Sequence, residues 1–354
     1  MRGFALAGAG PGVFPCAARQ SPPPLPMKHL IIIHGRSTKP SGSEKERLVK
    51  KALLHGLKRE HGDAAKKIET GKVECSHAYY GDINNRLMIA AGQKKKSDLP
   101  GVNDPGYGSG PCELPGSYDD DLDKLLARKT TAFKKADYQK LLDEHKDRRW
   151  KDEAASVLSA VAGIFGMNDQ LVAKATPDMG AYLLSRKAGS EVRQRLAIHL
   201  KPALLAGDDI CLVSHSMGCI VSYDTLWKYS QMSEYKDIQD TGNRVSLWLT
   251  LGCPLGEPGV IKNLYDAHEP ADGKYPCRII RRWENVAAHD DFVSHDEGVA
   301  DDFKEMRRLG YLESIKDRRI YNFWTGSDGA NPHKFYGYLD HPEVAALIAG
   351  WIAA

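Results

Sequence analysis

One segment of the chain places a serine where it could act as a nucleophile. Residues 210–221 read Ile-Cys-Leu-Val-Ser-His-Ser-Met-Gly-Cys-Ile-Val, with Ser216 in the middle. The apolar run before Ser216 is typical of a strand and the residues after it of a helix, so Ser216 falls at the apex of a very tight strand-to-helix turn. Such a turn strains the serine backbone and exposes its hydroxyl above a sheet. The pattern predicts that Ser216 is the nucleophile of a covalent reaction.

The residues two positions on either side of Ser216 have to be small, because strand and helix nearly touch there. Gly218 meets this requirement fully and Ser214 in part. The start of the helix also directs free N–H groups and the positive end of its dipole toward the turn. The alternative is an ordinary strand–turn–helix in which S-x-S-x-G occurs by chance. We favour the nucleophile because the segment lies at a junction within a chain of alternating strands and helices.

Strands and helices alternate along most of the chain, which predicts an α/β fold with a mainly parallel sheet and helices on both faces. Continuous aliphatic runs such as Ile31-Ile32-Ile33 are typical of strands that are buried on both sides. The predicted strands are 30–33, 73–80, 209–213, 244–251, 278–286 and 319–324. The predicted helices are 41–61, 179–205, 217–229, 300–309 and 341–352.

Residues 83–177 interrupt this alternation, and we predict that they form a helical insertion outside the sheet. Residues 98–118 are dense in Gly, Pro and Asp and predict a loop, whereas 119–150 and 154–175 have helical patterns. The apolar face of the last stretch either forms a lid that contacts an acyl chain or packs on the body of the domain. That face consists of Val157, Leu158, Val161, Ile164 and Phe165.

The first residues differ in composition from the rest of the chain. They are rich in Gly, Ala and Pro, and Arg2 followed by an apolar stretch resembles a weak signal peptide. Gly and Pro at 8–12 interrupt that stretch, and no clean cleavage site follows. We interpret residues 1–27 as a disordered or targeting-like extension, with Met27 as an alternative start, and residues 28–354 as the folded domain.

The composition is that of a soluble globular protein. Apolar residues make up 42% of the chain and charged residues 27%, and no stretch reaches the roughly 18 uncharged apolar residues of a membrane span. The net charge of +3 gives no reason to expect a nucleic-acid partner. The seven cysteines occur singly and form no CxxC pair, which favours a reducing compartment. We therefore expect a cytoplasmic protein.

Three segments resemble the α/β-hydrolase family. Residues 213–218 (Val-Ser-His-Ser-Met-Gly) resemble its nucleophile elbow, in the His-Ser-Met-Gly form common in lipases and esterases. Residues 31–36 (Ile-Ile-Ile-His-Gly-Arg) resemble the strand end that supplies part of the oxyanion hole. Residues 249–255 (Leu-Thr-Leu-Gly-Cys-Pro-Leu) resemble the strand and turn after the nucleophile helix. The resemblance spans 28–82 and 178–354, and it implies a hydrolase fold without the family's first two strands.

The family order of nucleophile, acid and histidine implies an acid after the strand 278–286. The family often has an aspartate two residues before a valine at this place. This spacing implies Asp291 as the acid, and Asp290 is the alternative. His289, His295 and Asp296 crowd the same loop. A metal site is a further interpretation of that cluster, although its spacing matches no strong ligand motif.

The same order implies a histidine base after the last strand. His333 lies in a polar loop and is the residue that the resemblance favours. His341 is the competitor, but Asp340-His341-Pro342-Glu343 is typical of a helix start with Asp340 as N-cap. An aspartate would hold the histidine in the tautomer that accepts the serine proton.

The family position of the oxyanion hole implies two backbone N–H donors, those of Arg36 and Met217. His215 precedes the nucleophile, and we expect it to face away from the apex and to have a structural role. Three residues at the end of the strand 73–80 either line the pocket or belong to the core and the turn: Tyr79, Tyr80 and Asp82.

These residues predict a serine hydrolase that cleaves a carboxylic ester through an acyl-enzyme on Ser216, without a metal or cofactor. The elbow does not separate an esterase from a thioesterase, an amidase or an acyltransferase. A phospholipase with peripheral membrane contact is a further alternative, as is a non-catalytic binding module of the same fold. The expected substrate is a small-molecule or lipid ester.

Overall fold

The computed structural model describes residues 26–37, 39–92, 118–128, 133–145, 177–294, 298–326 and 329–354. Within these residues six strands form one sheet in the order β2-β1-β3-β4-β5-β6, and every neighbouring pair is parallel. The expected α/β fold is confirmed. The strands are β1 (Lys28–Ile33), β2 (Val73–Ala78), β3 (Asp209–His215), β4 (Val245–Leu251), β5 (Ile280–Ala288) and β6 (Ser314–Ile320).

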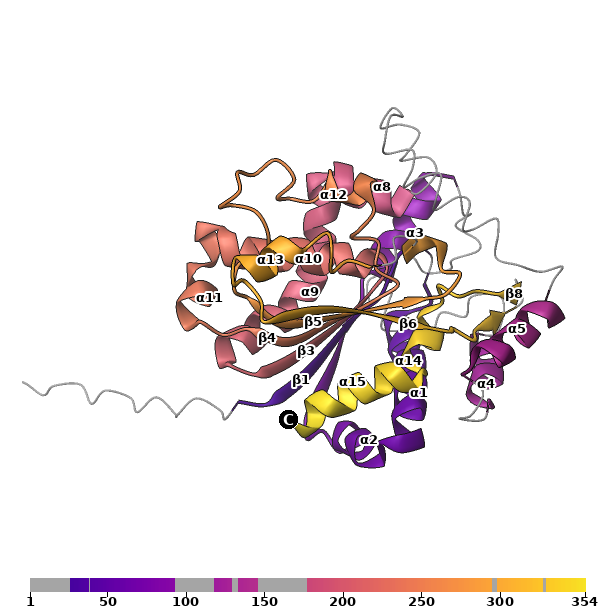
Figure 1. The fold of residues 1–354 in the computed structure, drawn as a ribbon. Helices are drawn as coiled ribbons and strands as arrows, with labels where there is room; N and C mark the ends of the chain where they lie inside the picture. The colour runs from indigo at the N-terminus through magenta and orange to yellow at the C-terminus, as the bar shows by residue number, and fades with distance from the viewer. Residues whose placement is uncertain are drawn as a thin grey trace, which may run out of the picture.

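Helices cover both faces of the sheet (Figure 1). One face carries α3 (Gly81–Ala90), α8 (Pro177–Leu184), α9 (Arg186–Ala206), α10 (Met217–Gln231), α11 (Lys236–Thr241), α12 (Pro258–Ile261) and α13 (Lys304–Arg308). The other carries α1 (Gly42–Glu60), α2 (Gly62–Glu69), α4 (Tyr118–Leu126), α5 (Lys135–Glu144), α14 (Phe335–Leu339) and α15 (Pro342–Ala353). Shorter elements are η2 (Ser233–Tyr235), η3 (Phe292–Ser294), β7 (Thr325–Gly326) and β8 (Gly329–Ala330).

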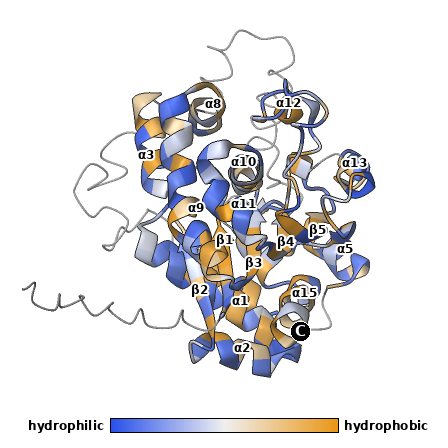
Figure 2. Cartoon of the chain, turned by 90° about the vertical axis from the view of Figure 1, so that its left-hand side faces the viewer, coloured by the Kyte–Doolittle hydropathy of each residue, from blue (hydrophilic) through white to orange (hydrophobic). Residues whose placement is uncertain are grey.

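The alternation of side chains along each strand divides the interior into two hydrophobic cores. Ile31 and Ile33 face the core under α8–α13, whereas Leu30 and Ile32 face the core under α1 and α15. Figure 2 shows the strands as the apolar interior between helices with mixed surfaces. Each such buried side chain stabilises the fold by about 1.5–3 kcal/mol. This double burial explains the continuous aliphatic runs of the sequence.

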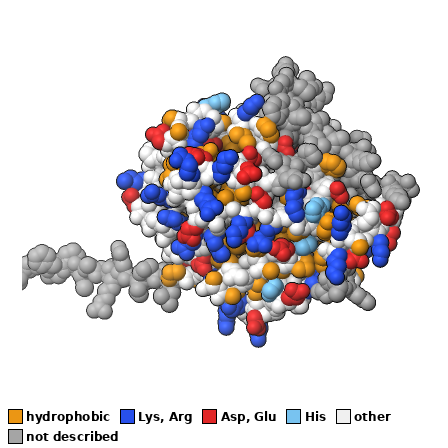
Figure 3. Space-filling view, viewed as in Figure 1, with side chains coloured by type: hydrophobic (Ala, Val, Ile, Leu, Met, Phe, Trp, Pro, Cys, Tyr) orange, Lys and Arg blue, Asp and Glu red, His pale blue; other side chains and the backbone are white. Residues whose placement is uncertain are grey.

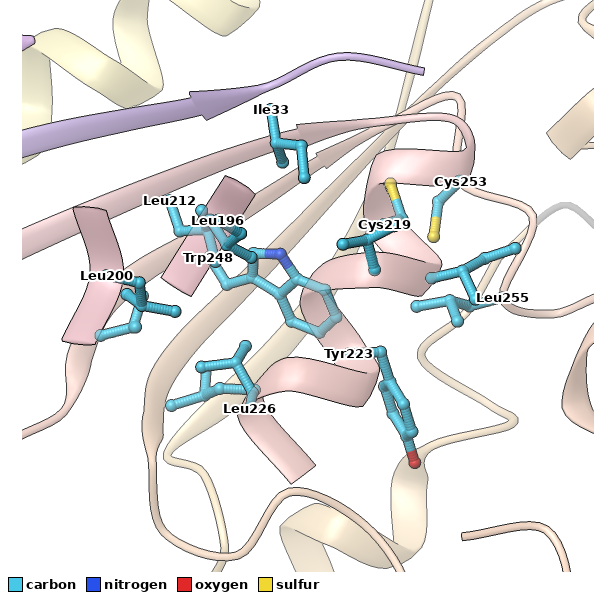
Figure 4. Packing of buried hydrophobic residues seen from close by; sticks show 14 of the residues in the cluster. Ile33, Leu196, Leu200, Leu212, Cys219, Tyr223, Leu226, Trp248, Cys253 and Leu255 are labelled. Atoms are coloured by element: carbon cyan, nitrogen blue, oxygen red, sulfur yellow. The ribbon is translucent and has the colours of Figure 1, made fainter. Parts of the chain in front are cut away.

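A tryptophan fills the centre of the core on the α10 side (Figure 4). The Trp248 ring comes from β4, and its centroid lies 4.3 Å from that of Trp283 on the neighbouring strand β5. The labelled neighbours in that view come from the sheet, from α9, from α10 and from the segment after β4: Ile33, Leu196, Leu200, Leu212, Cys219, Tyr223, Leu226, Cys253 and Leu255. The strand β3 and the helix α10, which flank Ser216, are thereby anchored in one packed layer.

Several predicted elements differ from the observed ones, and the helix expected over 300–309 is shortened to Lys304–Arg308. The helix expected over 179–205 is divided into α8 and α9 at Ser185, whose side chain caps α9 by accepting the N–H of Ala188 at 3.3 Å. The last strand, expected over 319–324, is β6 at Ser314–Ile320. β6 lies at the sheet edge and is largely charged, so its sequence lacks the apolar signal of a strand. The apolar residues that follow it, Phe323 and Trp324, are buried in irregular structure.

Part of the predicted insertion packs on the domain. Leu122 and Leu125 of α4, with Tyr138 and Leu141 of α5, belong to the core under α1 and α15. The apolar face at 157–165 lies outside the described residues, as do residues 1–25 of the extension.

The outer surface is mixed in charge. In Figure 3, Lys and Arg side chains lie interspersed with Asp and Glu on the visible face, as the near-balanced composition leads one to expect. Among the helices that the structure describes, none has the length and apolar character needed to cross a membrane.

Candidate active site

Ser216 lies at the tight turn between β3 and α10. Its backbone has φ 54° and ψ −126°, a strained left-handed conformation for a residue other than glycine. A Cβ at Gly218 would lie 2.6 Å from the carbonyl oxygen of His34, so only glycine fits at that position. The first turn of α10 therefore presses against the end of β1, and this contact fixes the turn. Ser216 is only 2% exposed, unlike the open hydroxyl expected from the sequence.

Ser214, two residues before Ser216, is accommodated by hydrogen bonds. Its hydroxyl accepts the indole N–H of Trp248 at 3.0 Å and lies 2.8 Å from the Ser222 hydroxyl of α10. The side chain is fully buried. Both partners are polar groups that would otherwise be unsatisfied in the core, so the serine has a structural reason to be there.

The structure brings Ser216, His333 and Asp291 together. The Nε2 atom of His333 lies 2.8 Å from the Ser216 hydroxyl, and its Nδ1 atom lies 2.9 and 3.0 Å from the two Asp291 carboxylate oxygens. The three residues come from the β3–α10 turn, the loop after β5 and the loop after β8. Because Asp291 can only accept, Nδ1 carries the proton and Nε2 accepts the serine hydroxyl. The three groups form a continuous chain of hydrogen bonds.

The alternative residues lie elsewhere. Asp290 is exposed, with φ 63°. His341 is the N-cap of α15, and its Nδ1 accepts the N–H of Glu343 at 3.1 Å. The expectation that Asp340 is this N-cap is wrong, because Asp340 ends α14 and its buried carboxylate binds His55 and Arg59 of α1. An ion pair with a neighbouring helix replaces the local cap.

The charge on Asp291 is stabilised although the carboxylate is buried. Burial acts to raise its pKa, but the charge of His333 and hydrogen bonds from His333, Tyr338 and the Val293 N–H outweigh it. The resulting pKa lies below the usual value for an aspartate. Asp291 is therefore ionised at neutral pH, as an acid that orients a histidine has to be.

The loop after β1 runs directly beside Ser216. A Cβ at Gly35 would lie 2.7 Å from the Cβ of Ser216, so a larger residue would displace the serine. The N–H groups of Arg36, in this loop, and Met217, at the start of α10, have no hydrogen-bond partner within the described residues. Within the described residues, two backbone donors without a partner thus lie next to Gly35 and Ser216 in the chain, the positions from which the sequence predicted an oxyanion hole.

His34 holds this loop in place and does not contact the Ser216 hydroxyl. Its Nε2 accepts the N–H of Tyr80 at 3.1 Å and its Nδ1 donates to the Gly35 carbonyl at 2.7 Å. The Tyr80 hydroxyl donates to the carbonyl of His34 at 2.5 Å. Burial lowers the pKa of His34 well below its usual value, so the ring is neutral. Tyr80 accordingly belongs to the support of the loop.

Asp178 holds the far side of the same loop. Its buried carboxylate, at the start of α8, accepts the backbone N–H of Ser37 and lies 3.4 Å from Nε of Arg36. Asp178 also accepts the N–H of Met179 at 2.9 Å. The loop is thereby connected to a helix more than a hundred residues away, which sequence reasoning did not anticipate.

His215 contacts the backbone of His333. Its Nε2 donates to the His333 carbonyl at 2.8 Å, across 118 residues of sequence. The His215 ring also stacks on Phe335 with centroids 4.7 Å apart and lies 4.8 Å from the His333 ring. Burial, and secondarily the charge of His333, lowers the pKa of His215 well below its usual value. The residue that precedes the nucleophile thus supports the loop of the histidine.

Gly252 and Tyr338 are two further residues at the site that sequence reasoning missed. Gly252 has φ 53°, and a Cβ there would lie 2.9 Å from Nδ1 of His333 and 3.0 Å from Asp291. The Tyr338 hydroxyl lies 2.6 Å from Asp291. Gly252 belongs to the turn 249–255 that resembles the family, which was the available signal. Tyr338 gave none.

A metal interpretation receives no geometric support from the described part of the chain, where no three His, Cys, Asp or Glu side chains gather as metal ligands would. His295 and Asp296 lie outside the described residues. His289 stacks on Tyr321 with ring centroids 4.4 Å apart.

Comparison with known proteins identifies no relative: no family model, curated protein or solved structure matches this chain. The function therefore has to be inferred from the chemistry of the site itself.

Proposed function

We propose that the protein is a serine hydrolase of the α/β-hydrolase type, which cleaves a carboxylic ester through an acyl-enzyme on Ser216. The observation that carries this proposal is the relay of hydrogen bonds from Ser216 to His333 at 2.8 Å and from His333 to Asp291 at 2.9 Å. Its position at the carboxyl ends of parallel strands, where α/β folds bind ligands, supports the same conclusion.

In the first half of the reaction, His333 takes the proton of Ser216 as the serine oxygen attacks the ester carbonyl carbon. The carbonyl electrons move to the oxygen, which the N–H groups of Arg36 and Met217 stabilise as an oxyanion. Asp291 steadies the imidazolium of His333. When the carbonyl reforms, the bond to the alcohol breaks and His333 gives its proton to the departing oxygen.

In the second half, His333 takes a proton from water as the water oxygen attacks the acyl-enzyme. The second tetrahedral intermediate collapses, the acid is released and the proton returns to Ser216. The strained backbone of Ser216 serves both steps, because it holds the oxygen in one direction relative to His333.

Labelling with a fluorophosphonate probe tests the nucleophile. We expect the intact protein to be labelled and to hydrolyse p-nitrophenyl esters, and Ser216→Ala to lose both, because the probe and the ester both bond to the serine oxygen. Ser43→Ala, at an exposed serine of α1, is the control and should retain both. Labelling of Ser216→Ala at the rate of the intact protein would contradict the assignment.

A panel of acyl esters, thioesters and amides then ranks the substrates that the same acyl-enzyme could serve. Hydrolysis of the ester in preference to the matched thioester and amide is the expected result. A folded protein that takes up no probe would instead favour the non-catalytic binding module.

A further inference from the structure

Tyr338 brings a buried hydroxyl to the carboxylate of Asp291. It lies on α14, the short helix that begins two residues after His333, and its side chain is fully buried. The hydroxyl oxygen accepts the N–H of Ala288, at the end of β5, at 2.9 Å. Its own proton is directed to Oδ2 of Asp291 at 2.6 Å. The end of β5 thus fixes the tyrosine oxygen, and the tyrosine contacts the acid that follows β5.

Each oxygen of Asp291 has one supporting donor besides His333. Oδ2 accepts from Tyr338, and Oδ1 accepts from the backbone N–H of Val293 at 3.0 Å. Together these donors hold both oxygens toward Nδ1 of His333, at 2.9 and 3.0 Å. Without the Tyr338 hydroxyl, Oδ2 would keep only its contact with His333, and the Val293 N–H on Oδ1 would be the one supporting donor left.

We propose that Tyr338 is a positioning residue for the reaction, whose hydroxyl orients the Asp291 carboxylate toward His333; this rests on the proposed function. The tyrosine is suited to the task because it stays protonated. Burial, followed by the charge of Asp291, raises the pKa of Tyr338 well above its usual value. The titratable groups that face this pair are His333 from the loop before α14 and His215 from β3, whose ring centroid lies 5.9 Å from that of Tyr338.

The test compares Tyr338→Phe with Tyr336→Phe on the same helix. Tyr336 is also buried, and its hydroxyl accepts from the ammonium of Lys45 at 2.8 Å. We expect Tyr338→Phe to lower kcat about tenfold or more with KM nearly unchanged, because charge-assisted hydrogen bonds are among the strong ones. We expect Tyr336→Phe to keep kcat within about twofold.

The pH profile of kcat/KM separates positioning from a merely structural role. Losing the Tyr338 donor raises the pKa of Asp291, so the Asp291–His333 pair holds its proton more tightly. The acidic limb of the profile of Tyr338→Phe should therefore move to higher pH, while that of Tyr336→Phe stays in place. If the acidic limbs of the two variants lay at the same pH and their kcat values were equal, the role of Tyr338 would be overturned and the proposed function would stand.

A double-mutant cycle with Asp291→Asn provides a second measurement. If Tyr338 acts through the carboxylate, Tyr338→Phe should lower kcat further by less than about twofold once Asp291 is replaced. A multiplicative loss would show a separate structural effect and overturn the proposal. Failure of the proposed function itself would look different, because the intact protein would then hydrolyse no ester and take up no probe.

Discussion

At the residue scale, the site consists of three hydrogen-bonded groups, which we propose to react, and the neighbours that restrict them. Gly35 and Gly218 pack so closely around Ser216 that a side chain at either position would clash, at Gly35 with Ser216 itself and at Gly218 with the His34 carbonyl. His333 is held at Nδ1 by Asp291 and at its own carbonyl by His215. The neighbours matter because a displacement of about 1 Å can cost on the order of a hundredfold in rate.

The hydrogen bond from His215 to the His333 carbonyl gives a prediction at this scale. His215→Phe keeps a ring against Phe335 but loses the donor. We expect kcat to fall about tenfold with little change in KM, because the base is less well placed and no contact with substrate is removed. His215→Gln, which can still donate, should recover part of the loss in steady-state kinetics. Identical kcat values for His215→Phe and His215→Gln would mean that the hydrogen bond to the His333 carbonyl is unimportant.

At the element scale, the parallel strands bring the groups of the proposed site to one edge of the sheet. β3 supplies Ser216, the loop after β5 supplies Asp291, and the β1 loop supplies the Arg36 N–H. The turn after β4 contributes close packing at Gly252. The loop that carries His333 follows the small hairpin of β7 and β8 and leads into α14.

Gly252 and Gly310 form a matched pair for testing the turn after β4. Both have left-handed backbones, with φ 53° and 68°, but a Cβ at Gly310 would have nothing within 4 Å. Each substitution by alanine should cost about 1 kcal/mol or more of unfolding free energy. Only Gly252→Ala should also lose activity, by about tenfold or more, because its Cβ would displace His333 and Asp291. Full ester hydrolysis by Gly252→Ala would contradict the observed packing.

At the scale of the whole molecule, two cores enclose the sheet and one of them contains a buried carboxylate. Asp224 of α10 accepts the hydroxyl of Tyr182 at 2.7 Å and the N–H of Tyr265 at 3.2 Å. Burial raises its pKa to about 7, despite these hydrogen bonds and the positive charge of Arg193, with Asp266 adding to the rise. The folded state thus binds this proton more tightly than the unfolded chain does.

The stability of the fold should therefore depend on pH through Asp224. The folded state binds more protons than the unfolded state between about pH 4 and pH 7, so unfolding free energy falls as pH rises through this window. The loss from this group is on the order of 4 kcal/mol by pH 8. In urea melts, Asp224→Asn should show a smaller drop between pH 5 and pH 8, whereas Asp240→Asn, at an exposed residue of α11, should match the wild type. If the unfolding free energy of Asp224→Asn fell as much as that of the wild type over this range, Asp224 would not be the source of the pH dependence.

Local patterns in the sequence predicted the elements that are buried on both faces. The aliphatic runs of β1, β3 and β4 and the turn with Ser216 and Gly218 can be read without a structure, because their signals come from a few neighbouring residues. The resemblance implied Asp291 and His333 through their order along the chain. That His333 meets Ser216, and Asp291 meets His333, at hydrogen-bond distance is a property of the fold.

The tertiary structure alone decided the features that depend on distant partners. β6 is largely charged and exists through its pairing with β5, and Asp340 pairs with Arg59 of α1 and does not cap the N-terminus of α15. The contacts of His215 with His333 and of Tyr338 with Asp291 join residues that lie far apart in the sequence. Local periodicity reports which face of an element is apolar, but a hydrogen bond or ion pair between distant segments exists only once packing has placed both partners.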